Sequence, residues 1–267
     1  MFRGELARTL RRPRTWLLAA SLAAMPVAIV IGVKVAPPDP AHSGGTPFLF
    51  PILRNGFFAG LTGLSVVQPF FLPLAVGLLA GDAIAGEAQT GMLRYLLIRP
   101  VSRTRLVLAK FASAMTVVAG LVVLTLVCGV VAGGLLFGLG PLPTLSGTEL
   151  SVAQTVIRVA EAGAFMIASL AGVAAIGIWI STLTDSGPGA TVATAIVAVA
   201  SQIFDRSPAL GSIHPYLPTH GWLGFVGLFR YPMDLDGVRH ALIGSAAYTA
   251  VFLTLAVIEF RRKDVTA

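Results

Sequence analysis

Charged side chains are scarce in this chain. Asp, Glu, Lys and Arg make up 12% of its 267 residues, against about 25% in a typical soluble domain. Hydrophobic residues make up 55%, and the mean hydropathy is +0.84. Water is therefore excluded as the solvent for most of the surface. The apolar stretches are long and continuous, without the period-two alternation of barrel strands, so the sequence predicts membrane-spanning helices.

Cysteine and the common catalytic motifs are also almost absent. The single cysteine, Cys128, lies within an apolar run, which excludes a disulfide framework or a CxxC zinc site. No G-x-x-x-x-G-K-[ST], HExxH or GxSxG motif occurs, so we expect this chain neither to bind ATP nor to be an enzyme. His214 and His220 have no acidic or cysteine companion nearby in the sequence. We therefore expect no metal site and no cofactor bound by this chain.

The apolar stretches predict an all-α, polytopic membrane protein that forms a single permease-like domain, residues 1–267. We expect six spans at about 16–35, 57–80, 106–139, 161–183, 188–204 and 238–260. The first is too long for the apolar core of a signal peptide, so we expect it to remain uncleaved. Gln68-Pro69 and Pro73 should kink the second span. The segment from Ser212 to Asp236 is too polar to span yet rich in aromatics, which favours interfacial or re-entrant helices.

Positive charge is distributed unevenly along the chain. The formal net charge is +7, but the basic residues flank apolar stretches, which favours contacts with membrane lipids over nucleic acid. Six spans place both termini on one side, and thirteen of the nineteen basic residues fall on that side. This bias predicts a multi-pass protein of the cell (plasma) membrane with cytoplasmic N- and C-termini. The thirteen are Arg3, Arg8, Arg11, Arg12, Arg14, Arg94, Arg99, Arg103, Arg105, Lys110, Arg261, Arg262 and Lys263.

The loop at residues 81–105, between the second and third spans, contains a short amphipathic helix in this interpretation. Its apolar stripe consists of Met92, Leu93, Leu96 and Leu97. The helix begins at Thr90-Gly91 and ends at Arg99-Pro100, because proline disfavours helix at the residue before it. Two interpretations stay open. The helix either lies on the membrane surface or docks into a cytoplasmic partner.

The run from Asp82 to Lys110 resembles a family signature: D-x-I-x-x-E-x-x-x-G-x-L-R-x-L-L-x-R-P-V-S-R-x-R-L-x-x-A-K. It is similar to the coupling loop of permeases in the type-2 class of ATP-binding-cassette (ABC) exporters. The resemblance implies a coupling helix that sits in a cleft of a separate ATPase subunit, which holds the ATP and Mg. It also implies that two permease copies pair, as a homo- or heterodimer. The residues assigned to ATPase coupling are Asp82, Glu87, Gly91, Met92, Leu93, Leu96, Leu97, Arg99, Pro100, Arg103 and Lys110.

Several charged and polar positions have two interpretations each. Asp82 and Glu87 lie where the second span leaves the bilayer and should pair either with the basic N-terminal segment or with Arg94 and Arg99. The first ten residues place Phe2, Leu6 and Leu10 on one face, which is typical of an interfacial helix, although an ordinary basic flank has the same composition. By resemblance this segment would be the connecting helix of the family.

Two polar positions within the spans are candidates for a pathway or gate. Glu161 lies one turn after Arg158. Its charge is therefore either neutralised by an ion pair with Arg158 or used in a contact with cargo. Gln68 lies beside the expected kink and either lines a pathway or makes a hydrogen bond between helices.

The sequence as a whole favours the permease subunit of an ABC exporter, coupled to ATP hydrolysis by a separate subunit. The cargo (lipid, drug, antibiotic or ion) is not identified by span composition. A stand-alone ion-coupled carrier is less consistent, because the acidic residues cluster at span ends and no internal repeat is found. A non-transporting membrane sensor or scaffold remains an alternative.

Overall fold

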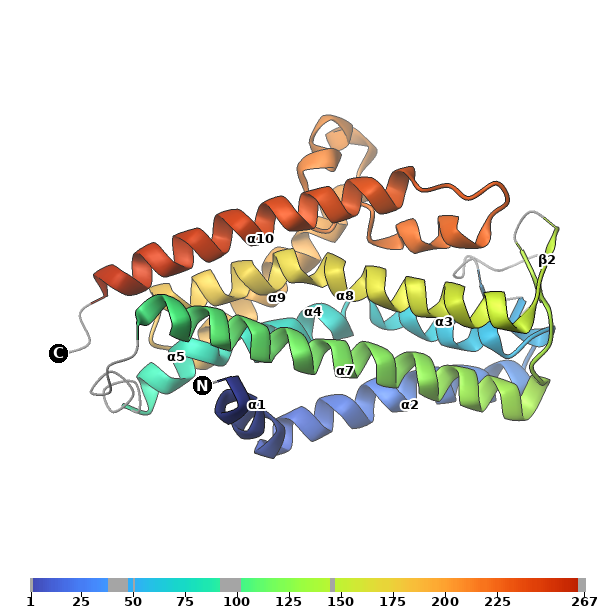
Figure 1. The fold of residues 1–267 in the computed structure, drawn as a ribbon, viewed down its shortest axis with the longest axis horizontal. Helices are drawn as coiled ribbons and strands as arrows, with labels where there is room; N and C mark the ends of the chain where they lie inside the picture. The colour runs from blue at the N-terminus through green and yellow to red at the C-terminus, as the bar shows by residue number, and fades with distance from the viewer. Residues whose placement is uncertain (1, 38–47, 50, 92–101, 145–146, 264–267) are drawn as a thin grey trace.

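Long helices running side by side dominate the computed structural model of the chain (Figure 1). The structure describes residues 2–37, 48–49, 51–91, 102–144 and 147–263. Among these residues, six helices are long and apolar enough to cross a membrane. The predictions of an all-α class and six spans are therefore confirmed. Both termini lie at the same end of the bundle, which we call the terminal end (Figure 1).

The helices and strands follow one another in a simple order. The terminal-end helix α1 precedes the first spanning helix, and a small antiparallel hairpin, β1–β2, precedes α8 at the opposite end (Figure 1). The bounds are α1 Phe2–Arg11, α2 Pro13–Val35, η2 Pro51–Leu53, α3 Phe57–Val67, α4 Phe71–Val76, η3 Gly77–Gly81, α5 Asp82–Gln89, α7 Arg103–Phe137, β1 Leu142–Pro143, β2 Glu149–Leu150, α8 Val152–Leu183, α9 Gly187–Asp205, η4 Pro208–Tyr216, η5 Trp222–Phe229 and α10 Asp236–Arg262.

The second predicted span is divided. Helix α3 ends at Val67, and the chain departs from helical geometry at Phe70, with φ −131° and ψ −54°, where Pro69 interrupts the backbone hydrogen bonds. The helix then resumes as α4, passes through one stretch of π-helix, η3, and continues as α5 to Gln89. The membrane-length piece is Phe71–Gln89, so helical structure extends into the segment expected to form a loop.

Helix α8 begins nine residues before the predicted start of the fourth span because its N-terminus is capped locally. The Ser151 hydroxyl accepts a hydrogen bond from the Gln154 amide, and the Gln154 side chain accepts one from the Ser151 amide. This reciprocal arrangement satisfies two backbone donors that the first helical turn would leave unpaired. At 32 residues, α8 is about 48 Å long, which exceeds a hydrocarbon core of about 30 Å.

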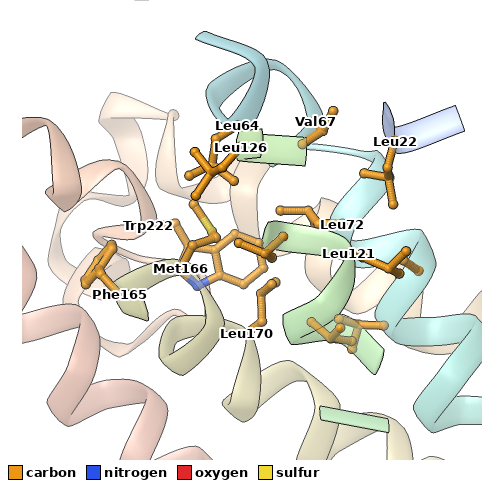
Figure 2. Packing of buried hydrophobic residues seen from close by; sticks show 14 of the residues in the cluster. Leu22, Leu64, Val67, Leu72, Leu121, Leu126, Phe165, Met166, Leu170 and Trp222 are labelled. Carbon is orange, nitrogen blue, oxygen red and sulfur yellow. The ribbon is translucent and has the colours of Figure 1, made fainter. Parts of the chain in front are cut away.

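Glycines allow α3 and α7 to pack with their backbones nearly touching. A Cβ at Gly129 would lie 2.6 Å from the Gly60 Cα, and one at Gly133 would lie 2.4 Å from the Gly56 carbonyl oxygen. Small residues of this kind let helices approach closely where water supplies no driving force. Helix α3 is buried almost throughout, and leucines from α2, α3, α4, α7 and α8 belong to the same buried cluster as Met166 and Trp222 (Figure 2).

The segment between α9 and α10 forms two 3₁₀ helices, η4 and η5. Trp222, Phe225 and Phe229 of η5 are buried, and Phe48 packs against Phe225 and Phe229 with ring centroids 6.1 and 5.5 Å apart. These three aromatic side chains therefore pack onto the bundle, whereas Tyr216 and Tyr231 of the same segment are 75% and 70% exposed.

Candidate functional site

A cluster of charged side chains joins α1 to the helices that flank the predicted coupling segment. We call it the terminal charge cluster. It consists of Glu5, Arg8, Arg12, Arg14, Asp82, Glu87 and Lys110. Its members come from α1, the start of α2, α5 and α7, so residues up to 105 positions apart in sequence meet at the terminal end of the bundle.

Glu87 and Lys110 form the buried centre of the cluster. They are 2% and 3% exposed, and the Lys110 Nζ lies 2.6 Å from the Glu87 Oε2, in ion-pair contact without the angles of a hydrogen bond. The same Nζ donates to the Glu5 Oε2 at 3.2 Å, and Arg8 donates to the Glu87 Oε1. Two cations therefore contact the Glu87 carboxylate, which offsets the cost of burying its charge.

Asp82 forms a second ion-paired group one and a half turns earlier on α5. Arg12 donates to the Asp82 Oδ2 at 2.7 Å, and Arg14 donates to the same oxygen. Asp82 is 6% exposed. Gly86 and Gly187 leave room for it, since a Cβ at either position would meet the Asp82 carboxylate. The expected pairing of Asp82 and Glu87 with the N-terminal segment is therefore present. The other expected partners, Arg94 and Arg99, lie outside the described residues.

Helix α5 is also bonded to the helices on its other side. The Ser181 hydroxyl of α8 accepts hydrogen bonds from the backbone amides of Ile84 and Ala85, at 3.0 and 2.9 Å. The Gln89 side chain accepts one from the Gly187 amide at the start of α9, at 3.3 Å. Helix α5 is therefore linked to α1, α7, α8 and α9 by polar contacts at the terminal end.

Arg103 lies at the start of α7 and contacts the end of α10. Its Nη1 donates to the carbonyl oxygens of Phe260, Arg261 and Lys263, at 2.8, 3.0 and 2.8 Å. A helix C-terminus carries unpaired carbonyl groups and a partial negative charge, so a guanidinium is well suited to that position. The sequence analysis assigned Arg103 to ATPase coupling, and the contacts that the structure gives it are with its own chain.

The predicted coupling segment is described only at its edges. Helix α5 ends at Gln89, and Gly91 has φ +69°, a left-handed conformation that glycine adopts at low cost. Met92, Leu93, Leu96, Leu97, Arg99 and Pro100 lie outside the described residues. On the N-terminal helix, Leu6 packs against the core, whereas Phe2 and Leu10 are 40% and 42% exposed.

The two polar candidates within the spans have protein partners. The Gln68 side chain is 3% exposed, and its Nε2 donates to the Gln202 Oε1 of α9 at 3.0 Å, which is the interhelical hydrogen bond considered from the sequence. The Arg158 Nη1 donates to the Glu161 Oε2 at 2.8 Å. The i, i+3 neutralisation considered from the sequence is therefore present.

No group of three His, Cys, Asp or Glu side chains within the described ranges could hold a metal ion. His220 nevertheless has an acidic neighbour in space, because its Nδ1 lies 2.6 Å from the Asp205 Oδ1. The connection between α9 and η5 brings these residues together, and sequence spacing alone did not indicate it.

Six membrane-length helices, with a buried ion-pair cluster at the end where both termini lie, define a polytopic helical membrane protein. The family model described as ABC-2 family transporter protein matches residues 2–201, and the chain belongs to this family. It is an ABC-2 transporter permease subunit, a class that itself lacks ATPase activity.

Two curated relatives share part of the sequence, and both are named probable ABC transporter permease protein NosY. The Stutzerimonas stutzeri protein is 34% identical over 134 residues, which cover 50% of this chain and 44% of the relative. The Pseudomonas aeruginosa protein is 37% identical over 109 residues, which cover 41% of this chain and 35% of the relative. The matched regions thus span less than half the length of each relative.

Proposed function

We propose that this chain couples ATP hydrolysis by a separate cassette ATPase to the export of a cargo across the cell membrane. In this proposal the segment from Met92 to Ile98 docks into the ATPase, the termini face the cytoplasm, and the permease acts as a homo- or heterodimer. Family membership supports an ATPase partner, and the unequal distribution of basic residues supports the orientation.

The terminal charge cluster is the observation that carries the proposal. The predicted coupling segment connects α5 to α7. Lys110 of α7 lies against Glu87 of α5, and both are bonded to α1 through Glu5 and Arg8. A displacement applied to the segment therefore reaches three helices that are already held together. A free loop joining two independently mobile helices would absorb the same displacement.

The position of the buried charges favours this function over a stand-alone ion-coupled carrier. Such carriers place ionisable groups near the middle of the membrane, in the path of the coupling ion. Here the buried carboxylates Asp82 and Glu87 are ion-paired at the terminal end of the bundle. The buried polar contact beside the α3–α4 break is formed by the uncharged Gln68 and Gln202.

Photo-crosslinking can test the docking face. A photoreactive amino acid at Leu93 or Leu96, on the apolar stripe, should crosslink to a cassette ATPase in native membranes. The same amino acid at Tyr95 or Ile98, on the opposite side of the same predicted helix, should crosslink weakly or to lipid. A crosslink to lipid from all four positions would show that the segment lies on the membrane surface.

Activity provides the second arm of the test. Leu93→Asp combined with Leu96→Asp should abolish stimulation of the co-purified ATPase while membrane insertion stays normal, since charge in an apolar groove prevents docking. Tyr95→Asp combined with Ile98→Asp adds the same charge to the other face and should leave stimulation intact. Unchanged transport in the Leu93/Leu96 variant would refute the coupling role.

A further inference from the structure

A groove opens on the surface of the bundle, between α8, η5 and the first half of α10. None of the functions discussed above uses it. Its volume is about 470 Å³, within the range of about 300–1,000 Å³ typical of small-molecule sites. Its walls are mostly apolar, and the ion pair of Arg158 and Glu161 lies on α8 at one end. The apolar lining includes Ala164, Ala168, Leu228, Met233, Leu235 and Leu242.

Helix geometry places the polar and apolar parts of this groove at different membrane depths. Helix α8 is about 18 Å longer than the hydrocarbon core. If that excess is shared between its ends, the first six residues rise about 9 Å through the headgroup region. Arg158 then lies at the hydrocarbon boundary, while Ala164 and Ala168 lie about 9 and 15 Å further along the helix. Figure 1 shows the first half of α8 at the end of the bundle opposite the termini, where η5 lies beside it, and α10 begins alongside the middle of α8.

The two small side chains on α8 form the floor of the groove, and longer ones form its sides. Ala164 and Ala168 are exposed. Met233 and Leu235, which also line the groove, are 44% and 49% exposed, and Leu228 is almost fully buried. Arg158, Glu161, Ala164 and Ala168 follow one another at intervals of three or four residues on one face of α8, so the groove extends along this helix from the ion pair. This shape suits a hydrocarbon chain lying parallel to α8, with its polar end beside Arg158.

The ion pair indicates which headgroup fits. The Arg158 side chain is 24% exposed and the Glu161 side chain 43% exposed, so a ligand can reach both. A guanidinium has five N–H donors and can contact a phosphate as well as Glu161. The Glu161 carboxylate can accept hydrogen bonds from an ammonium group. A headgroup that carries only negative charge would face repulsion from Glu161, and a choline group has no N–H to donate.

We propose that this groove binds one zwitterionic phospholipid of the ethanolamine type from the surrounding bilayer. The phosphate contacts Arg158, the ammonium contacts Glu161, and an acyl chain lies along Ala164 and Ala168. The bound lipid bridges α8 to η5 and α10. The site requires neither the coupling segment nor an ATPase, so its test is independent of the proposed function.

Native mass spectrometry of the purified chain can test this proposal with defined lipids. After delipidation, the chain receives phosphatidylethanolamine, phosphatidylcholine or phosphatidylglycerol of identical acyl composition. We expect one tightly bound phosphatidylethanolamine, retained about tenfold more strongly than phosphatidylglycerol, since a hydrogen bond to a charged group contributes roughly that factor. Glu161→Gln should remove that preference. Equal retention of all three lipids, or a preference for phosphatidylglycerol, would overturn the proposal.

Two alanine variants on α8 distinguish lipid bound in the groove from lipid bound elsewhere on the protein surface. Ala168→Leu fills the floor and should abolish retention of the tight lipid. Ala160→Leu makes the same change at an exposed position that does not line this groove, and retention should persist. If Ala168→Leu instead lowers the fraction of dimer in the same spectra, a second copy of the chain covers the groove and the lipid assignment is wrong. Retention unaffected by Ala168→Leu would also contradict it.

Discussion

Replacing Lys110 with methionine tests whether the terminal charge cluster holds the bundle together. Methionine keeps most of the length of the lysine chain and removes its charge. The Nζ of Lys110 is 2.6 Å from one buried carboxylate oxygen, on Glu87, and 3.2 Å from another, on Glu5. Because Glu87 is 2% exposed, water cannot replace the lost cation. Lys110→Met therefore leaves a buried carboxylate with one cationic partner fewer.

The expected loss follows from these contacts. Removing one partner of a buried ion pair costs about 3–5 kcal/mol. Arg8 stays bonded to Glu87, and the Glu5 side chain keeps 12% of its surface exposed, so the lower end, about 3 kcal/mol, is the appropriate value. In a domain of this size, 1 kcal/mol corresponds to roughly 2–4 °C in Tm. Lys110→Met should therefore lower Tm by roughly 6–12 °C.

Thermal unfolding in lipid nanodiscs can measure this difference. Lys34→Met is the matched control, because Lys34 is exposed at the other end of the bundle, with its Nζ 5.5 Å from the centre of the Phe137 ring. That contact contributes at most about 1 kcal/mol. Adding Glu87→Gln to Lys110→Met removes the uncompensated charge and should recover part of the lost stability. Equal Tm values for the two lysine variants would refute the reasoning, as would a double variant less stable than Lys110→Met alone.

Two further predictions concern packing within the membrane. Gly129→Val should cost about 1–3 kcal/mol through overpacking, because its Cβ would lie 2.6 Å from the Gly60 Cα. Gly120→Val, with no atom within 4 Å of the added Cβ, is the control in the same Tm assay, and equal losses would contradict the close approach of α3 and α7. Gln68→Leu should cost about 1–2 kcal/mol by leaving Gln202 without its donor. A change of cargo selectivity at wild-type stability would instead place Gln68 in a pathway.

The number of spans was predictable because hydrophobicity over about 20 residues is a composition signal that needs no tertiary information. The helix bounds were harder to predict. Helix α8 starts early because Ser151 and Gln154 cap it, and the sequence analysis placed the span start at the later change in hydropathy, Glu161. Pro69 signalled the kink in the second span, but the π-helix at Gly77–Gly81 depends on packing against α8 and α9.

The sequence identified several residues of the candidate site, but it did not indicate which of them contact one another. Asp82 and Glu87 were identified as charges at a membrane boundary that require partners, and the basic N-terminal segment was one of two options. The triad of Glu5, Lys110 and Glu87 was missed, since it joins residues 105 and 23 positions apart across three helices. The contacts of Arg103 with the end of α10 were not predicted either. Nothing local indicates that the C-terminus of α10 lies beside the start of α7.

On the proposed coupling role, the geometry also indicates where the second span can bend. Helix α5 is fastened to its neighbours, and the π-helix before it has no room to move, because a Cβ at Gly77 or Gly81 would lie 2.7 or 2.8 Å from backbone oxygens of α9. The break at Gln68–Phe70 differs, since its backbone hydrogen bonding is already interrupted and Phe70 is 55% exposed. Hinges are a few residues at element ends that absorb changes in φ and ψ. A displacement at Gly91 would therefore be absorbed at this break, between α3 and the packed unit of α4, η3, α5 and α9, beside the Gln68–Gln202 hydrogen bond.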